Sequence, residues 1–276
     1  MILYYDGSLD GFICLLGHAV KEHLPVTAIL SSKKPASVAL FEQERIIVTD
    51  PDWAATVAGG LHKKLGQRFM RELAQAYYSE EKEIEHDLLH LVRRALKSGP
   101  GVLGNLADPL INRVASAAQK TGRESHRLLG LLRFRRLIDD SYLACCAPRT
   151  NAAPLTGSHF AARFQAMRWV ILDEKRQLGI FGTTDGWQLC TDVAIAPELL
   201  QHAEENEIAT LWRNFYHNIS NPDRFNPKLR RQFMPKKEWR YLTEMQPEGA
   251  SASPSESESE SESPSPSMIS KQNESR

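Results

Sequence analysis

Two windows of the sequence combine basic and aromatic side chains. Residues 123–136 hold five arginines against one acid, a net charge of +4, and residues 224–240 hold seven basic residues against one acid, a net charge of +6. Guanidinium groups form paired hydrogen bonds with phosphate, and aromatic rings stack on unpaired bases. A single charged run is usually a solvated face. Two such windows in one half of the chain favour a surface that binds a polyanion.

The first window predicts a basic stripe along a helix. At about 100° per residue, six residues fall on or beside one narrow arc: Arg123, His126, Arg127, Gly130, Arg133 and Phe134. A glycine within the stripe lets a phosphate backbone approach the helix, while close packing against another helix explains Gly130 equally well.

Further candidates lie outside this stripe. His159 and Arg163 are four residues apart and share one face of a predicted helix. His159 is either a general acid or base, a phosphate ligand, or a structural residue. The residues predicted to contact nucleic acid are Arg123, His126, Arg127, Arg133, Phe134, His159, Arg163, Arg176, Arg224, Arg230, Lys236 and Trp239.

A second kind of chemistry is suggested by Asp173 and Lys175. On a continuous strand these two side chains project to the same side, and Asp140 ends an earlier predicted strand. An acid followed by Asp-x-Lys is the pattern by which restriction-type nucleases hold Mg²⁺ and activate water. The catalytic candidates are therefore His159, Asp173 and Lys175, and the metal-ligand candidates are Asp140 and Asp173. The alternative is a hairpin turn at residues 173–176.

Other catalytic templates are missing from the sequence. It has no Walker A loop, no dinucleotide G-x-G-x-x-G, no H-E-x-x-H and no G-x-S-x-G. The four cysteines include no C-x-x-C pair and no zinc spacing, which argues against a disulfide framework or a structural zinc. No cofactor is predicted, apart from Mg²⁺ on the nuclease hypothesis.

The elements that must position these residues follow from hydrophobic periodicity and turn residues. The turn Asp6-Gly7-Ser8 begins a helix with Ser8 as its cap, and a phosphate site at the helix start is the alternative. One apolar stripe predicts a buried helix face: Ile208, Leu211, Trp212, Phe215 and Ile219. The predicted strands are 2–5, 45–48, 137–146, 169–173, 177–183 and 186–193. The other predicted helices are 53–78, 81–97, 109–135, 158–168 and 198–219.

This order of elements predicts an α+β protein, largely helical in its first half, with a small antiparallel sheet packed with helices in its second half. We divide the chain into a mostly helical strand-helix region (1–100), a basic α+β region (101–246) and a disordered Ser/Glu/Pro tail (247–276). The tail holds six acids and two bases, a net charge of −4, and residues 121–246 hold 18 bases and 14 acids, a net charge of +4. The neutral total charge therefore does not exclude a polyanionic partner.

Composition bounds the class of protein. A hydrophobic content of 42% is enough for a sizeable core. No apolar run approaches the roughly 18 to 20 residues that a membrane span needs, and the first residues do not resemble a signal peptide. We expect a soluble cytoplasmic protein with no membrane partner.

Six ordered blocks carry a resemblance to a known family. The blocks are Tyr5-Asp6-Gly7-Ser8-Leu9-Asp10-Gly11-Phe12, Glu124-x-His126-Arg127-x-x-Gly130-x-x-Arg133-Phe134, His159-Phe160-x-x-Arg163-Phe164, Asp173-x-Lys175-Arg176, Leu211-Trp212-x-x-Phe215-Tyr216 and Met234-Pro235-Lys236-Lys237-x-Trp239. Over about residues 1–244 the chain resembles a bacterial family described as DNA-metabolism or DNA-repair proteins, whose shared region is a domain of unknown function.

The resemblance implies a DNA context but names no reaction and supplies no catalytic residues. It also implies a partner encoded nearby, a radical S-adenosylmethionine protein with a helix-hairpin-helix DNA-binding region. Some relatives are fused to a uracil-DNA-glycosylase-like domain. Here the Ser/Glu tail follows instead, so that activity is not implied.

The leading hypothesis is an accessory protein of DNA repair or DNA metabolism that acts with the radical S-adenosylmethionine partner. On this hypothesis its arginines bind phosphates, and Trp239 or Phe134 stacks on an exposed base. One alternative is a metal-dependent nuclease or nucleotide hydrolase that uses Asp140, Asp173 and Lys175. The other is a non-catalytic interaction scaffold whose aromatic residues are simply core.

Overall fold

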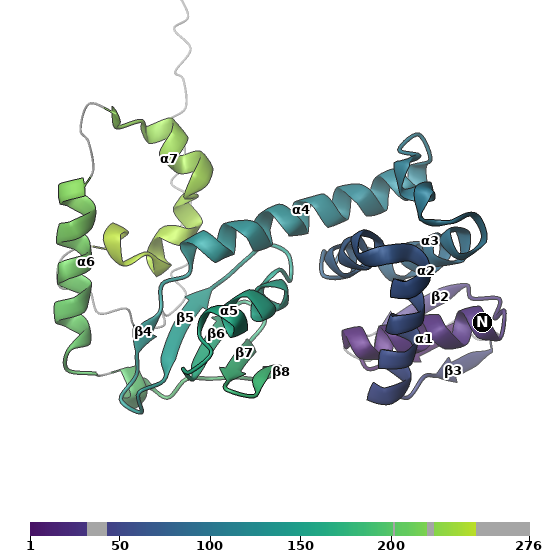
Figure 1. Cartoon of the computed structure of the whole chain (residues 1–276), viewed down its shortest axis with the longest axis horizontal. Coiled ribbons are helices and arrows are strands. Elements are labelled where there is room, and N and C mark those ends of the chain that lie inside the picture. Colours follow the sequence, from purple (N-terminus) through teal and green to yellow (C-terminus); the bar gives the residue numbers. More distant parts are fainter. Residues whose placement is uncertain (32–42, 201, 220–223, 247–276) are drawn as a thin grey trace, which may run out of the picture.

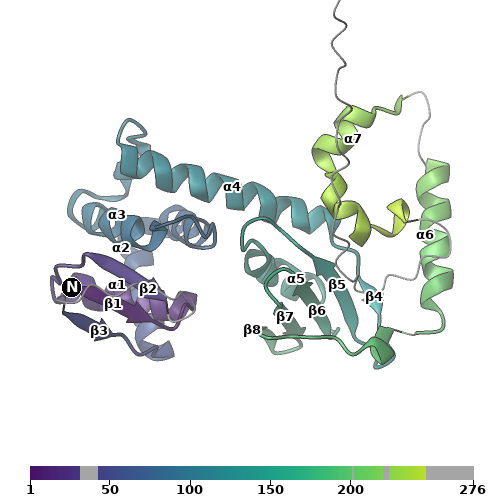
Figure 2. The ribbon, with the colours of Figure 1, turned by 180° about the vertical axis from the view of Figure 1, so that it is seen from behind.

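The computed structural model describes residues 1–31, 43–200, 202–219 and 224–246. Two lobes are joined by one long helix, α4 (Pro109–Leu131), which runs from the first lobe across the top of the second (Figure 1). Seen from behind, each lobe has its small sheet below this helix (Figure 2). The predicted tail, residues 247–276, lies outside the described residues.

The first lobe is built on a three-stranded parallel sheet. Its strands are β1 (Ile2–Tyr5), β2 (Ala28–Ser31) and β3 (Glu44–Ile46), in the order β2-β1-β3. Helix α1 (Leu9–Lys21) lies between β1 and β2 in the chain. Ser8 caps α1, because its hydroxyl accepts a hydrogen bond from the Gly11 N–H at 2.9 Å. The predicted cap is therefore confirmed.

Helices complete the first lobe and form its core. Helix α2 (Pro51–Tyr77) is capped by Asp50 and bends at Gly66, whose φ of 84° is open to glycine but costly for other residues. Helix α3 (Ile84–Ser98) and the first half of α4 pack beside it. The core draws buried side chains from β1 and all four helices, among them Leu3, Phe12, Phe69, Leu88 and Val114.

The second lobe contains a five-stranded mixed sheet. Its strands are β4 (Arg135–Arg136), β5 (Tyr142–Cys146), β6 (Trp169–Asp173), β7 (Leu178–Thr183) and β8 (Gly186–Cys190), in sequence order across the sheet. Strands β5 and β6 are parallel because the segment with α5 (Gly157–Arg163) crosses over between them, and the other pairs are antiparallel. Helices α6 (Glu205–Ile219) and α7 (Pro227–Phe233) follow the sheet.

The predicted α+β class, the helical first half and the sheet in the second half are confirmed. The antiparallel succession β6-β7-β8 also matches the three predicted strands closely. The sheet as a whole is mixed rather than antiparallel, and β2 of the first lobe is a strand that the sequence pattern does not predict. No helix among the described residues is long and apolar enough to cross a lipid bilayer.

The prediction of a buried apolar face on residues 198–219 is wrong. In α6 the side chains of Leu211 and Ile219 are 68% and 66% exposed, and Ile208 and Phe215 are about half exposed. The helix stands at the side of the lobe in Figure 1. It is attached through Trp212, whose indole N–H donates to Glu244 at 2.9 Å, and through Glu205, which accepts a hydrogen bond from the Arg136 N–H at 3.0 Å. An apolar stripe at helical spacing shows that a face is apolar, but not that anything covers it.

Candidate nucleic-acid interface

The exposed face of α4 carries positive charge and no negative charge. The helix contains four basic residues and one acid, and that acid, Glu124, is buried. Arg123 is exposed and Arg127 is half-buried, and within the described chain neither has a hydrogen bond or an ion pair. A Cβ at Gly130 would meet no described atom within 4 Å, so the surface is open there. Of the two explanations for Gly130, an open helix face agrees with this geometry and close helix packing does not.

Glu124 faces the opposite way and anchors two other segments to α4. Its carboxylate accepts hydrogen bonds from the N–H groups of Arg149 and Thr150, at 2.9 and 2.8 Å, and from the Thr150 hydroxyl at 2.7 Å. The Lys237 ammonium lies 3.1 Å away. Burial on its own raises the pKa of Glu124, but these partners outweigh it and lower the pKa to about 2. The single acid of α4 is therefore neutralised inside the protein.

The second basic window lies around α7 and the short 3₁₀ helix Lys236–Tyr241. Figure 1 shows α7 above the carboxyl-terminal end of α4, and the Lys237–Glu124 ion pair holds the 3₁₀ helix against α4. The Arg230 guanidinium lies between two rings, 4.9 Å from the centroid of Phe225 and 5.0 Å from that of Trp239. The Trp239 indole N–H donates to the Met234 carbonyl at 2.9 Å. Trp239 is thus already stacked on one face.

Arg133 and Phe134 are engaged within the second lobe. Arg133 makes a bidentate pair with the buried Glu244, at 3.2 and 2.7 Å, and donates to the Gly130 carbonyl at 2.9 Å. Phe134 packs at 5.1 Å from Phe160 and 5.0 Å from Phe164, centroid to centroid. These two predicted contact residues therefore already have structural partners.

The predicted residues of α5 are displayed on the surface. His159 and Arg163 are both exposed, on the same helix face that their spacing predicted. Arg163 lies 5.7 Å from the Phe164 ring, and His159 makes an edge contact with Phe160 at 5.1 Å. The exposed Arg224 and Lys236 belong to the second basic window and have no partner among the described residues.

Asp173 and Lys175 do not form a paired strand motif. Asp173 is fully buried at the end of β6 and bonds the Arg176 guanidinium at 2.8 Å, whereas Lys175 lies in the following turn and donates to the Arg149 carbonyl at 3.0 Å. Burial raises the pKa of Asp173 despite the opposing effect of Arg176. Arg176 also pairs with Glu80 of the first lobe, with its Nε 3.1 Å from the carboxylate. The turn is the alternative that the geometry matches.

Asp140 lies at the other end of the sheet from Asp173. The register pairs Cys146 with Asp173 at one end of β5, and Asp140 precedes the opposite end of that strand. Asp140 is exposed and pairs with Arg136 at 2.6 Å. Within residues 1–31, 43–200, 202–219 and 224–246 no three His, Cys, Asp or Glu side chains cluster as metal ligands would. The residues named for the nuclease hypothesis are therefore not brought together.

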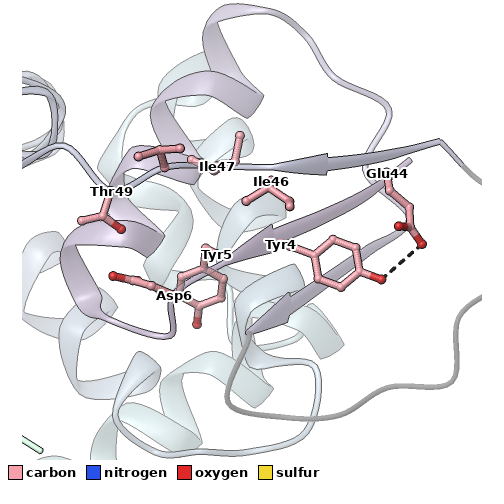
Figure 3. Close-up of a pocket in the computed structure, with 8 residues that line it drawn as sticks. Tyr4, Tyr5, Asp6, Glu44, Ile46, Ile47 and Thr49 are labelled. Atoms are coloured by element: carbon pink, nitrogen blue, oxygen red, sulfur yellow. Dashed lines mark hydrogen bonds between the residues drawn. The ribbon is translucent and has the colours of Figure 1, made fainter.

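A pocket in the first lobe involves residues that sequence reasoning did not select. Tyr4, Glu44 and Thr49 line it together with Asp6, at the ends of β1 and β3 (Figure 3). These residues come together only because β1 and β3 are parallel neighbours in the sheet. The sequence pattern does not predict this pairing, since it indicates no strand at β2 and β3 is only three residues long.

Comparison with known proteins gives one match. The family model described as a domain of unknown function, DUF4130, matches residues 82–244, which include α3, α4 and all but the last two described residues of the second lobe. No curated protein and no solved structure matches the chain significantly. The family match spans more than half of the chain and contains every residue of the basic surface described above, and the chain therefore belongs to the DUF4130 family.

Proposed function

We propose that the protein is a DNA-binding accessory protein of DNA repair or DNA metabolism, which holds the phosphate backbone on its second lobe. The observation that carries this proposal is the outer face of α4, on which Arg123 and Arg127 have no acidic partner within the part of the chain that the structure describes. Arginine without a protein partner binds phosphate without first losing an ion pair. The open surface at Gly130 adds room for a backbone to lie along the helix.

The second basic window extends this face. Lys237 links the 3₁₀ helix to α4, and Lys236 beside it is exposed. Arg224 and Lys228 are exposed at and just after the start of the described segment 224–246. Basic side chains from α4 and from the segment 224–246 would therefore contact successive phosphates of one DNA backbone.

Phosphate contacts support the proposal better than base stacking does. Phe134 is packed in an aromatic cluster, and one face of Trp239 is covered by Arg230. Binding through phosphates alone is strongly salt-dependent and weakly sequence-dependent. We accordingly assign any reaction on DNA to the radical S-adenosylmethionine partner that the family resemblance implies, and DNA presentation to this chain.

The test measures DNA binding by the full chain with Arg123→Ala and Arg127→Ala combined. Fluorescence anisotropy on labelled single and double strands is followed between about 50 and 200 mM salt. We expect roughly tenfold weaker binding at the low-salt end and a salt slope smaller by about 2 for duplex DNA, because two phosphate contacts are lost.

Lys63→Ala combined with Lys64→Ala is the matched control, since both lysines are exposed on α2 of the first lobe. The control is expected to bind as the unaltered protein does. If both double variants lose the same DNA affinity, the loss follows from the change in net charge, and a specific site on α4 is contradicted. Absence of any DNA binding at low salt would remove the proposal altogether.

A further inference from the structure

Helices α6 and α7 each turn an apolar face to water. On α6 this face consists of the four side chains of the stripe described above, from Ile208 to Ile219. On α7 it consists of Leu229 and Phe233, with Phe225 just before the helix, and these three are also half exposed or more. Figures 1 and 2 both show the two helices at the end of the second lobe that lies away from the first lobe.

The apolar area of these two faces is larger than a monomer usually exposes. Taking about 200 Å² for a fully exposed large apolar side chain, the seven side chains leave on the order of 800 Å² open to water. Exposed apolar patches of more than a few hundred Å² mark interaction sites. A standard protein–protein interface buries about 800 Å² on each partner. The two faces together are therefore large enough for a specific interface.

The rest of the chain has too few apolar side chains to cover these faces. The neighbouring segments outside the described residues are 201, 220–223 and 247–276, and their only large apolar side chains are Met268 and Ile269. Residues 32–42 connect two strands of the other lobe. The occupant that matches the area is therefore a second molecule.

Charge favours a second copy of the same chain as that molecule. Residues 204–212 hold three acids and no base, whereas α7 holds three bases and no acid. Of the three acids, Glu207 is exposed and has no hydrogen bond or ion pair to a described residue. Within one chain, α7 lies near the carboxyl-terminal end of α6, away from these acids (Figure 1). The acidic half of α6 therefore complements α7 of another copy, and pairing of α7 with a second α7 is disfavoured.

We propose that two copies of the chain associate through these helices, with the apolar face of α6 in one copy packed on that of α7 in the other. Two-fold symmetry repeats the contact, so each copy contributes both helices and the assembly closes as a dimer. We expect a dissociation constant on the order of 10 µM, because α6 is attached to its own lobe by few hydrogen bonds and loses further freedom on binding. Protein at about 1 µM is then mostly monomeric, and its unfolding reports on the single chain.

Sedimentation equilibrium of the full chain between about 1 and 200 µM tests the proposal, and a monomer–dimer equilibrium without larger species is expected. Phe215→Ser on α6 and Phe233→Ser on α7 are each expected to weaken dimerisation at least tenfold, because each lost contact occurs twice in the dimer. Both side chains are exposed in the single chain, so the variants keep the fold. Ile138→Ser is the matched control, since Ile138 is similarly exposed in the second lobe but lies outside both helices.

The proposal is overturned if the full chain stays monomeric throughout this range, or if Ile138→Ser weakens dimerisation as much as the two phenylalanine variants do. A dimer that Phe215→Ser weakens and Phe233→Ser does not would contradict the pairing of α6 with α7. The DNA affinity of Phe215→Ser, measured below 1 µM protein, is expected to be unchanged, because α6 contributes nothing to the basic surface. Loss of dimerisation with unchanged DNA affinity separates this interface from the proposed function, and absence of DNA binding would leave the sedimentation result intact.

Discussion

The buried carboxylate of Glu124 holds together the segments that form the basic surface. Its hydrogen bonds fix the loop at residues 149–150 and the 3₁₀ helix that contains Lys236 and Lys237. Because the carboxylate is buried, it adds no negative charge to the exposed face of α4. The carboxylate is stabilised in its charged form, since its pKa falls from 4.5 to about 2 in the folded protein. That shift ties the stability of the second lobe to pH.

We expect Glu124→Gln to destabilise the protein by roughly 3 kcal/mol at pH 7. The folded-state pKa lies below the unfolded value, so this contribution is present above about pH 4.5 and is lost as the pH falls towards 2. Urea unfolding at neutral and acidic pH measures it, with the exposed Glu207→Gln as the control. A stability difference between Glu124→Gln and the unaltered chain that stays constant down to the lowest accessible pH would contradict this account.

Individual arginines illustrate what the sequence can and cannot predict. Helical spacing placed Arg123 and Arg127 correctly on one exposed face, because the rule needs only neighbouring residues. Arg133 and Arg176 looked equivalent to them in sequence, yet they pair with Glu244 and Glu80, which are 111 and 96 residues away. Such distant partners depend on the complete fold, so local charge alone overestimates the free arginines.

At the scale of elements, α6 is the clearest case of an amphipathic helix whose apolar face remains exposed. Its position is held by hydrogen bonds of Trp212 to Glu244 and of Glu205 to the Arg136 N–H rather than by burial of the stripe. Sequence periodicity predicted the helix and its apolar side but could not supply the surface needed to cover it. The same limit applies to β5 and β6, whose parallel pairing depends on the crossover and not on strand composition.

We expect Leu211→Ala to change the free energy of unfolding by less than about 0.5 kcal/mol, because the side chain is 68% exposed. Leu128→Ala is the matched substitution in the core of the second lobe, where the side chain is 3% exposed, and it is expected to cost about 2–5 kcal/mol. Chemical denaturation of both variants checks the contrast. Similar losses for the two would mean that α6 is packed in solution.

At the scale of the whole molecule, charge is divided between regions. Residues 247–276 hold six acids and two bases, and the 126 residues before them carry the opposite net charge. We expect removal of residues 247–276 to tighten DNA binding several-fold at low salt and to have little effect at high salt, because screening weakens competition between exposed charges.

Replacing the tail's six glutamates by glutamine in the full chain separates charge from chain length. The DNA affinities of the truncated protein and of the glutamine variant are measured by the anisotropy assay used for the arginine variants. Low-salt affinities equal to that of the unaltered chain would contradict competition by the tail. Tighter binding after truncation but not after the glutamine replacements would assign the effect to chain length instead.

The shared helix α4 limits how the chain can be divided. Val114 in its first half completes the core of the first lobe, and Leu128 in its second half completes that of the second. A fragment that begins at residue 101 keeps α4 but exposes the apolar side of the first half of this helix to water. A fragment limited to residues 82–244 keeps α3 but lacks α2, so most of the same apolar side is exposed there too. We therefore expect both fragments to be less stable than the intact polypeptide, which is the form to use in biochemical work.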